Sequence, residues 1–172
     1  MVALVGEGHL TPAAEQVAAK AGVGLRTVFR HFSDMESLYA GMAERLAGEY
    51  RDWQAPFAAD DWRGQLIEMR DRRLGTYERL MPYKRAADVH RHASLTIQRT
   101  HAATLATMRA RLEQLLPAAI VADPVTLETL DLMLSFEVWQ RLRLDQGLSS
   151  DAARAVIARA IERLTAGVSD QP

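Results

Sequence analysis

The chain has 172 residues, of which 48% are apolar, and its formal net charge at pH 7 is −1. A chain of this length and apolar content can bury a hydrophobic core. It contains no cysteine, which excludes disulfide bonds, thiolate metal sites and cysteine nucleophiles. No apolar run reaches the roughly 18 residues that span a bilayer and no basic-then-apolar leader opens the chain, so we expect a soluble, cytoplasmic protein without a membrane partner.

The hydrophobic pattern is helical along the whole sequence, because alanine, leucine, arginine and glutamate dominate and no sustained alternation of β-branched residues occurs. Glycine, proline and serine interrupt the pattern at residues 6–10, 22–24, 33–34, 54–60, 81–82, 117–124 and 147–150. These interruptions predict an all-α fold of about nine helices, counting a short first helix at residues 1–7.

Capping residues mark several helix ends. Thr11 followed by Pro12 is a predicted N-cap with proline at the first helical position. Ser33 is predicted to cap the helix that follows it through a capping box with Glu36, unless Asp34 is the cap instead. The remaining signals are Asp123 and Ser150 at helix starts and Gly22 and Gly147 at helix ends.

Residues 11–32 contain two short helices separated by a glycine turn. In the helix at residues 25–32, Leu25, Val28 and Phe32 share one face, which we expect to pack on Val17 and Ala21 of the helix before it. The opposite face carries Arg26, Thr27, Arg30 and His31. This is the plan of a helix-turn-helix, whose second helix enters the major groove: arginine there suits guanine edges or phosphates, and threonine, including Thr11, suits phosphate oxygens. The alternative is a solvated face on a helical hairpin.

The charge of the first 50 residues is distributed unevenly. Lys20, Arg26 and Arg30 lie close together, whereas four of the six acidic residues in this segment occur at Asp34 or later. The local balance therefore favours an anionic partner near residue 26.

These residues also resemble a known family. The motif residues are Thr11, Val17-Ala18, Ala21-Gly22-Val23, Thr27-Val28-Phe29, Phe32 and Glu36-x-Leu38, and they resemble the DNA-binding domain of the tetracycline-repressor (TetR) family over about residues 3–46. The resemblance implies a DNA-binding domain at residues 1–46 and a ligand-binding and dimerisation domain at residues 47–172. It further implies a homodimeric repressor that binds a near-palindromic operator in double-stranded DNA and is released by a small-molecule effector. The DNA-binding positions that it implies are Thr11, Gly24, Leu25, Arg26, Thr27, Phe29, Arg30 and His31.

The sequence departs from the family pattern at three positions. Gly24 stands where the family usually has serine, Phe29 where it has tyrosine, and Met35 where it has a lysine that contacts the DNA backbone. The chain also begins inside the family's first helix. Since each lost phosphate contact weakens binding, the alternative is a helical small-molecule-binding or interaction protein with weak or lost DNA binding.

Three ionisable residues fall in the middle of apolar stripes on the later helices. Arg70 lies among Leu66, Ile67, Leu74, Tyr77 and Met81; His101 among Ile97, Leu105, Met108, Leu112 and Leu115; Glu137 among Leu130, Met133, Leu134 and Leu144. Because a buried charge needs a partner or a polar cavity, we expect Arg70, His101 and Glu137 to bind the polar end of a ligand. The body of the ligand is predicted to pack on Tyr77, Met108, Met133 and Phe136. The alternative is a self-satisfied network, such as Glu137 with Arg141 or Arg70 with Glu137.

The last two long helices are apolar on more than one face, which predicts more than one packing partner. The residues expected to pair with a second chain in a four-helix bundle are Leu132, Val138, Trp139, Leu142, Val156, Ala160 and Ile161. The alternative is burial within one chain.

Other chemistry has little support in the sequence. His90 and His92 point in different directions on a helix, and neither they nor His101 has an acidic residue at metal-ligand spacing. No nucleophile–base pair, phosphate-binding glycine loop or carboxylate pair is present. We therefore expect no metal, no cofactor and no enzymatic activity.

Overall fold

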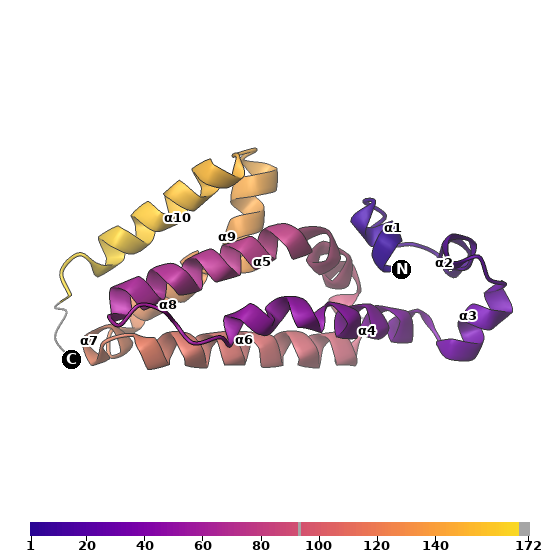
Figure 1. Ribbon diagram of the computed structural model, residues 1–172, viewed down its shortest axis with the longest axis horizontal. Coiled ribbons are helices and arrows are strands. Elements are labelled where there is room, and N and C mark those ends of the chain that lie inside the picture. The colour runs from indigo at the N-terminus through magenta and orange to yellow at the C-terminus, as the bar shows by residue number, and fades with distance from the viewer. Residues whose placement is uncertain (93, 169–172) are drawn as a thin grey trace. The chain divides into compact units, whose positions relative to one another are not determined.

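The computed structural model describes residues 1–92 and 94–168, and within these ranges it is all-helical, without a strand (Figure 1). The elements are α1 (Val2–Gly6), α2 (Ala14–Ala21), α3 (Leu25–His31), α4 (Met35–Leu46), the 3-10 helix η1 (Ala47–Trp53), α5 (Trp62–Arg91), α6 (Leu95–Leu115), α7 (Ala118–Val121), α8 (Pro124–Met133), α9 (Phe136–Gln140), the π-helical segment η2 (Arg141–Asp145) and α10 (Ser150–Thr165). The expected all-α class is confirmed. Over the described ranges, no helix combines the length and the apolar character that crossing a bilayer requires.

The helices form two compact units. Unit 1 comprises Met1–Arg51 and Arg79–Thr104, and unit 2 comprises Asp52–Glu78 and the chain from Leu105 onward. The two long helices α5 and α6 each contribute one end to unit 1 and the other end to unit 2. Unit 1 therefore contains more of the chain than the expected DNA-binding domain at residues 1–46.

The hydrophobic core of unit 1 begins with the packing of α2 on α3. Val17 and Ala18 of α2 and Val28 of α3 are buried in one cluster with Leu4 of α1 and Leu38 of α4. Gly22 ends α2 with φ of +67°, a left-handed conformation in which a side chain is strained, as the sequence predicts. Two details of the predicted packing are wrong, since Ala21 is exposed and Leu25 is 37% exposed.

Local hydrogen bonds correct two of the predicted caps. The first helical residue of α2 is Ala14 rather than Pro12, and the Ala13 N–H donates to Gln16 Oε1 at 2.8 Å. Thr11 lies before this turn and does not cap it. At α4 the alternative cap is correct: Asp34 Oδ1 accepts from the Ser37 N–H at 2.8 Å.

The caps of the later helices are close to the expected positions. Asp123 caps α8 as predicted, and Gly147 has φ of +65°. The cap of α10 is Ser149, one residue before the expected Ser150.

Helix α5 continues through the predicted break at Met81–Pro82. Proline removes one backbone donor and crowds the preceding turn, which is why it usually ends a helix. Here Leu80, Met81 and Ala86 are all buried on either side of Pro82, so packing of this part of the helix in unit 1 outweighs the lost hydrogen bond. As a result, the residues from Tyr83 to Arg91 stand on one helix with regular spacing.

In unit 2 a helix that was expected to be continuous is broken: the helix predicted at residues 124–146 is interrupted. Helix α8 ends at Met133, and Ser135 caps a new helix, α9, by accepting from the Val138 N–H at 3.2 Å. The chain then passes into η2 before α10. With α7 also present between residues 117 and 124, the described residues form ten α-helices rather than about nine.

Candidate functional site

The outer face of α3 is open to solvent. Val28 is buried against α2, while Arg26, Arg30 and His31 are exposed and Phe29 is 45% exposed. Thr11, Gly24 and Leu25 are also exposed, and Thr27 is half-buried. Most of the residues expected to face DNA are therefore accessible. Those on α3 present two guanidinium groups, an imidazole and an apolar ring on one short helix.

Two neighbouring residues change the expected electrostatics of this face. Lys20 Nζ lies 2.6 Å from Glu7 Oε1, and this hydrogen bond lowers the pKa of the Glu7 carboxyl. The positive charge of Lys20 is thus compensated by Glu7, and the remaining positive charge on this face comes from Arg26 and Arg30. Met35, expected as a lost phosphate contact, packs against the buried cluster of α1–α4, so an apolar residue suits its position.

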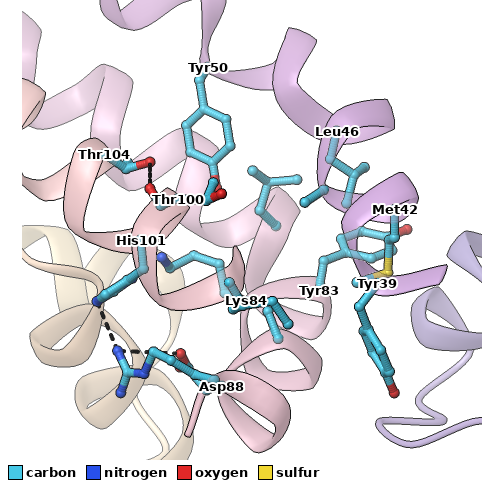
Figure 2. Close-up of a pocket in the computed structure, with 15 residues that line it drawn as sticks. Tyr39, Met42, Leu46, Tyr50, Tyr83, Lys84, Asp88, Thr100, His101 and Thr104 are labelled. Atoms are coloured by element: carbon cyan, nitrogen blue, oxygen red, sulfur yellow. Dashed lines mark hydrogen bonds and ion pairs between the residues drawn. The ribbon is translucent and has the colours of Figure 1, made fainter. Parts of the chain in front are cut away.

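Unit 1 also contains a cavity of about 220 Å³ (Figure 2). Its lining comes from four elements: Tyr39, Met42, Ala43 and Leu46 of α4; Tyr50 of η1; Leu80, Tyr83, Lys84, Ala87, Asp88 and Arg91 of α5; and Ile97, Thr100, His101 and Thr104 of α6. The volume exceeds the roughly 150 Å³ of an apolar cavity known to hold benzene and is below the roughly 300 Å³ at which most drug-sized pockets begin. The space suits a ligand with one ring and a short chain.

One end of the cavity is polar. Arg91 Nη1 lies 2.8 Å from His101 Nε2 and 3.7 Å from Asp88 Oδ1. Arginine has only donors, so Nε2 accepts in this contact and His101 is a neutral ring with its proton on Nδ1. Lys84 extends towards Thr100 and His101 (Figure 2). With Lys84 and Arg91 positive and Asp88 negative, the lining has a formal charge of +1.

The other end is aromatic and apolar. Tyr39, Met42, Leu46 and Tyr83 gather on the side away from His101 (Figure 2). The Tyr50 hydroxyl points towards Thr100, and burial raises the pKa of Tyr50 to about 12. This hydroxyl stays protonated at neutral pH and is available as a hydrogen-bond donor or acceptor.

Helix α4 contacts both the α2–α3 pair and the cavity. Its residue Leu38 is buried in the cluster that holds α2 and α3, whereas Tyr39 and Met42 are buried in a second cluster with Val5 and Ala86 and line the cavity. Tyr39 donates its hydroxyl to the Leu10 carbonyl at 3.3 Å, just before α2. Helix α4 thus contacts α2, α3 and the cavity lining within unit 1.

The residues expected to form a ligand pocket are not brought into one site. His101 lines the cavity of unit 1, but Arg70, Tyr77, Met108, Met133, Phe136 and Glu137 belong to unit 2. Arg70 pairs with its neighbour Asp71 at 2.9 Å, and Glu137 is exposed, so the prediction of a mid-stripe carboxylate is wrong. The interruption at Ser135 changes the face that Glu137 occupies.

The aromatic residues of that expected pocket form packed core instead. The Tyr77 hydroxyl donates to the Leu134 carbonyl at 3.1 Å, and the Tyr77 ring meets Phe136 edge-on at 5.6 Å between centroids. Met108 is 8% exposed beside them, and Met133 is half-buried. Ile67 and Leu105 of the expected stripes are about half exposed, at 49% and 47%.

The residues expected at a dimer interface divide into two groups. Trp139, Leu142 and Ile161 are at most 6% exposed, because α10 packs back on α8 and η2, so these three side chains have almost no surface left for a second chain. Leu132 and Val156 are 55% and 47% exposed, and Val138 and Ala160 are half-buried. Only the second group remains available for an interface.

The histidines make other contacts. The His90 ring lies against Tyr39 with 4.0 Å between the ring centroids and a tilt of 35°, and burial lowers the pKa of His90. His92 is exposed. In the part of the chain that the structure describes, no three His, Asp or Glu side chains are grouped as a metal ion would require.

Sequence reasoning missed most of the cavity lining, in particular Tyr83, Lys84, Asp88 and Arg91. They follow Pro82, and a helix end at that proline separates them from the helix predicted before it. Comparison of the chain with family models, curated proteins and solved structures gives no match. The features that bear on function are the exposed face of α3, the cavity, and helix α4, which packs on α3 and lines the cavity.

Proposed function

We propose that this protein is a ligand-responsive, sequence-specific DNA-binding transcriptional regulator of the TetR type, acting as a homodimeric repressor on a near-palindromic operator. The observation that carries the proposal is the position of α4. One of its faces holds the helix-turn-helix through Leu38, and another lines the cavity through Tyr39 and Met42. The surface proposed to face DNA and a ligand-sized cavity thus share one structural element.

The chemistry of α3 supports DNA as its partner. Arg26 and Arg30 are exposed, and arginine binds guanine edges bidentately or contacts phosphates. Phe29 is 45% exposed between them, and an apolar side chain at this place suits the methyl group of thymine. Thr11 is exposed just before α2, and a threonine hydroxyl there suits a phosphate contact of the kind that positions a helix-turn-helix on its site.

The proposed mechanism is a shift between two populations of the protein. Ligand in the cavity favours a position of α4 in which the two α3 helices of the dimer no longer match successive major grooves. A coupling free energy of about 3 kcal/mol lowers operator affinity by roughly 150-fold, which is sufficient for release. Leu132 and Val156 are the exposed apolar residues assigned to the dimer contact.

Selection from a random pool of double-stranded DNA tests this function. The full chain is expected to enrich a near-palindromic sequence, and the Arg26→Ala/Arg30→Ala variant to enrich none. A charge-matched control, Arg99→Ala/Arg163→Ala, removes two exposed arginines of α6 and α10 instead and should enrich the same sequence as the unmodified protein. Equal enrichment by the Arg26/Arg30 variant would contradict the assignment of α3.

A second candidate function is a helical small-molecule-binding or interaction protein with weak or lost DNA binding. The ion pair of Lys20 with Glu7 favours it, because Arg26 and Arg30 are then the cations that the described face of α3 offers to DNA. A folded protein that enriches no DNA sequence but binds a small molecule would support this function over the first.

A further inference from the structure

We propose that the cavity of unit 1 binds small aromatic monocarboxylates, with the carboxylate at the Lys84–Arg91 end and the ring at the Tyr39–Tyr83 end. This inference deepens the proposed function, because it names the ligand class of the cavity that α4 shares with the DNA-facing helices. It rests on the size, the charge and the polarity gradient of the cavity.

The size of the cavity limits the ligand. A volume of about 220 Å³ accepts one aromatic ring with a chain of two or three atoms and a carboxylate. Fused polycyclic ligands and long acyl chains need the roughly 300–1,000 Å³ of ordinary drug-sized pockets.

The charge of the lining selects an anion. The formal charges of Lys84, Arg91 and Asp88 sum to +1, and His101 adds none because its Nε2 accepts from Arg91. The Asp88 carboxylate lies 3.7 Å from the Arg91 guanidinium, so its negative charge already has a partner within the protein. A carboxylate is stabilised beside this net positive charge, whereas an ammonium group is repelled.

The opposite end selects an aromatic body. Tyr39, Tyr83 and Met42 lie together at the end away from His101 (Figure 2). Aromatic rings pair favourably in offset or edge-on arrangements, and the methionine sulfur also contacts ring edges favourably. A ligand with a ring at one end and a carboxylate at the other matches both ends of the cavity.

Isothermal titration calorimetry of the full chain without DNA tests the inference. The probes are 3-phenylpropanoate, 3-phenylpropanamide and 3-phenylpropylamine, which share a ring and chain but carry a negative, no and a positive charge. We expect the carboxylate to bind at least about tenfold more tightly than the amide, which corresponds to about 1.4 kcal/mol. The amine should bind most weakly, because the net positive charge of the lining repels it.

Two variants locate the charge that is recognised. Lys84→Gln should remove the preference for carboxylate over amide, and Lys84→Arg, which keeps the charge, should retain it. Both substitutions keep a long polar side chain, and a thermal melt of each checks that it is folded. Binding of the amide should be nearly equal in all three proteins.

Several results would overturn the inference. They are equal binding of carboxylate and amide, tighter binding of the amine, an unchanged preference in Lys84→Gln, and no binding of any probe up to about 10 mM, which is weaker than a ligand of this size should show in a matching site. None of these results depends on DNA, so failure here leaves the DNA selection experiment unaffected. Conversely, if the carboxylate binds but no DNA sequence is enriched, the proposed ligand class is supported and the proposed DNA-binding function is contradicted.

Discussion

The ion pair between Glu78 and Arg143 in unit 2 makes a sharp prediction about stability. Glu78 Oε1 accepts from Arg143 Nη2 at 2.7 Å, and Glu78 Oε2 accepts from Arg143 Nε at 3.1 Å and from the Trp139 indole N–H at 3.0 Å. Replacing Glu78 with glutamine keeps the shape but opposes an amide N–H₂ to the guanidinium. A fully buried charge-assisted hydrogen bond contributes about 1.5–3 kcal/mol, whereas an exposed ion pair contributes about 0–1 kcal/mol.

The exposure of this pair places the expected loss between these limits. The side chains of Glu78 and Arg143 are 35% and 23% exposed, so solvent screens them partly. We expect Glu78→Gln to lower the free energy of unfolding by about 1–2 kcal/mol at pH 7. In a chain of this size that loss lowers the thermal midpoint by roughly 2–8 °C.

The pH dependence of this loss follows from the pKa of Glu78. The hydrogen bonds from Arg143, with the Arg143 charge and Trp139 as further causes, lower the folded-state pKa of Glu78 below its ordinary value of 4.5. The stabilisation is therefore complete above the unfolded-state pKa and is lost as the pH falls through the lower, folded-state pKa. The difference between the unmodified protein and Glu78→Gln should be constant near neutral pH and shrink below about pH 4.5.

Urea unfolding followed by circular dichroism between pH 7 and pH 3 measures this difference. The matched control is Glu162→Gln, because Glu162 also lies 2.7 Å from an arginine, Arg159, but both side chains are more than 60% exposed. Its loss should be below about 0.5 kcal/mol. A Glu78→Gln loss that persists undiminished at pH 3, or a control loss of equal size, would refute the reasoning.

Three further predictions concern the core, the turn and the cavity. Tyr77→Phe removes the buried hydrogen bond to the Leu134 carbonyl and should lower the thermal midpoint by roughly 2–4 °C, measured by calorimetry; no change would contradict that bond. Gly22→Ala forces a side chain into the left-handed region and should lower the free energy of unfolding by about 1–2 kcal/mol, with Gly22→Asn losing less; equal losses would place the cause elsewhere. Ala87→Phe places a ring in the cavity and should abolish binding of 3-phenylpropanoate while the protein remains folded, and retained binding in calorimetry would mean that the ligand occupies another site.

Local signals in the sequence predicted much of unit 1. The pairing of α2 with α3 follows from the spacing of Val17 and Val28 and from the left-handed turn at Gly22, all of which depend on residues within a few turns of one another. The exposure of Arg26 and Arg30 follows from the same periodicity. The start of α2 was predicted two residues early because a threonine–proline pair is a good cap wherever tertiary packing allows it.

The cavity could not be predicted because it depends on a tertiary effect at one residue. Pro82 usually ends a helix, but burial of Leu80, Met81 and Ala86 keeps α5 continuous there. Only with that continuity do Tyr83, Ala87 and Arg91 share one helical face. The α4 residues that line the cavity opposite this face lie about 40 residues earlier in the chain. Hydrophobic periodicity predicts local structure and does not show which distant segments meet.

Unit 2 shows the reverse error for a related reason. Residues 124–146 have an unbroken helical pattern, yet Ser135 begins a new helix, and the registers of α8 and α9 differ. Glu137 was placed on a buried face by counting from Leu130 across this break, and it is exposed. Trp139 was assigned to a second chain, although α10 and Glu78 of its own chain account for its burial.

The most direct test of the central claim, that α3 binds DNA, is the salt dependence of affinity for the selected operator, measured by fluorescence anisotropy. Each phosphate contact contributes about 0.9 to the slope of log K against log salt concentration, so Arg26→Ala/Arg30→Ala should flatten it by about 1.8 for one bound α3, and by about 3.6 for a two-fold dimer, where both arginines contact phosphates. Where an arginine binds a guanine edge instead, its loss lowers the affinity without flattening the slope. The Arg99→Ala/Arg163→Ala control should leave the slope unchanged. An unchanged affinity and slope in the α3 variant, or an equal loss of affinity in both variants, would contradict DNA binding by α3.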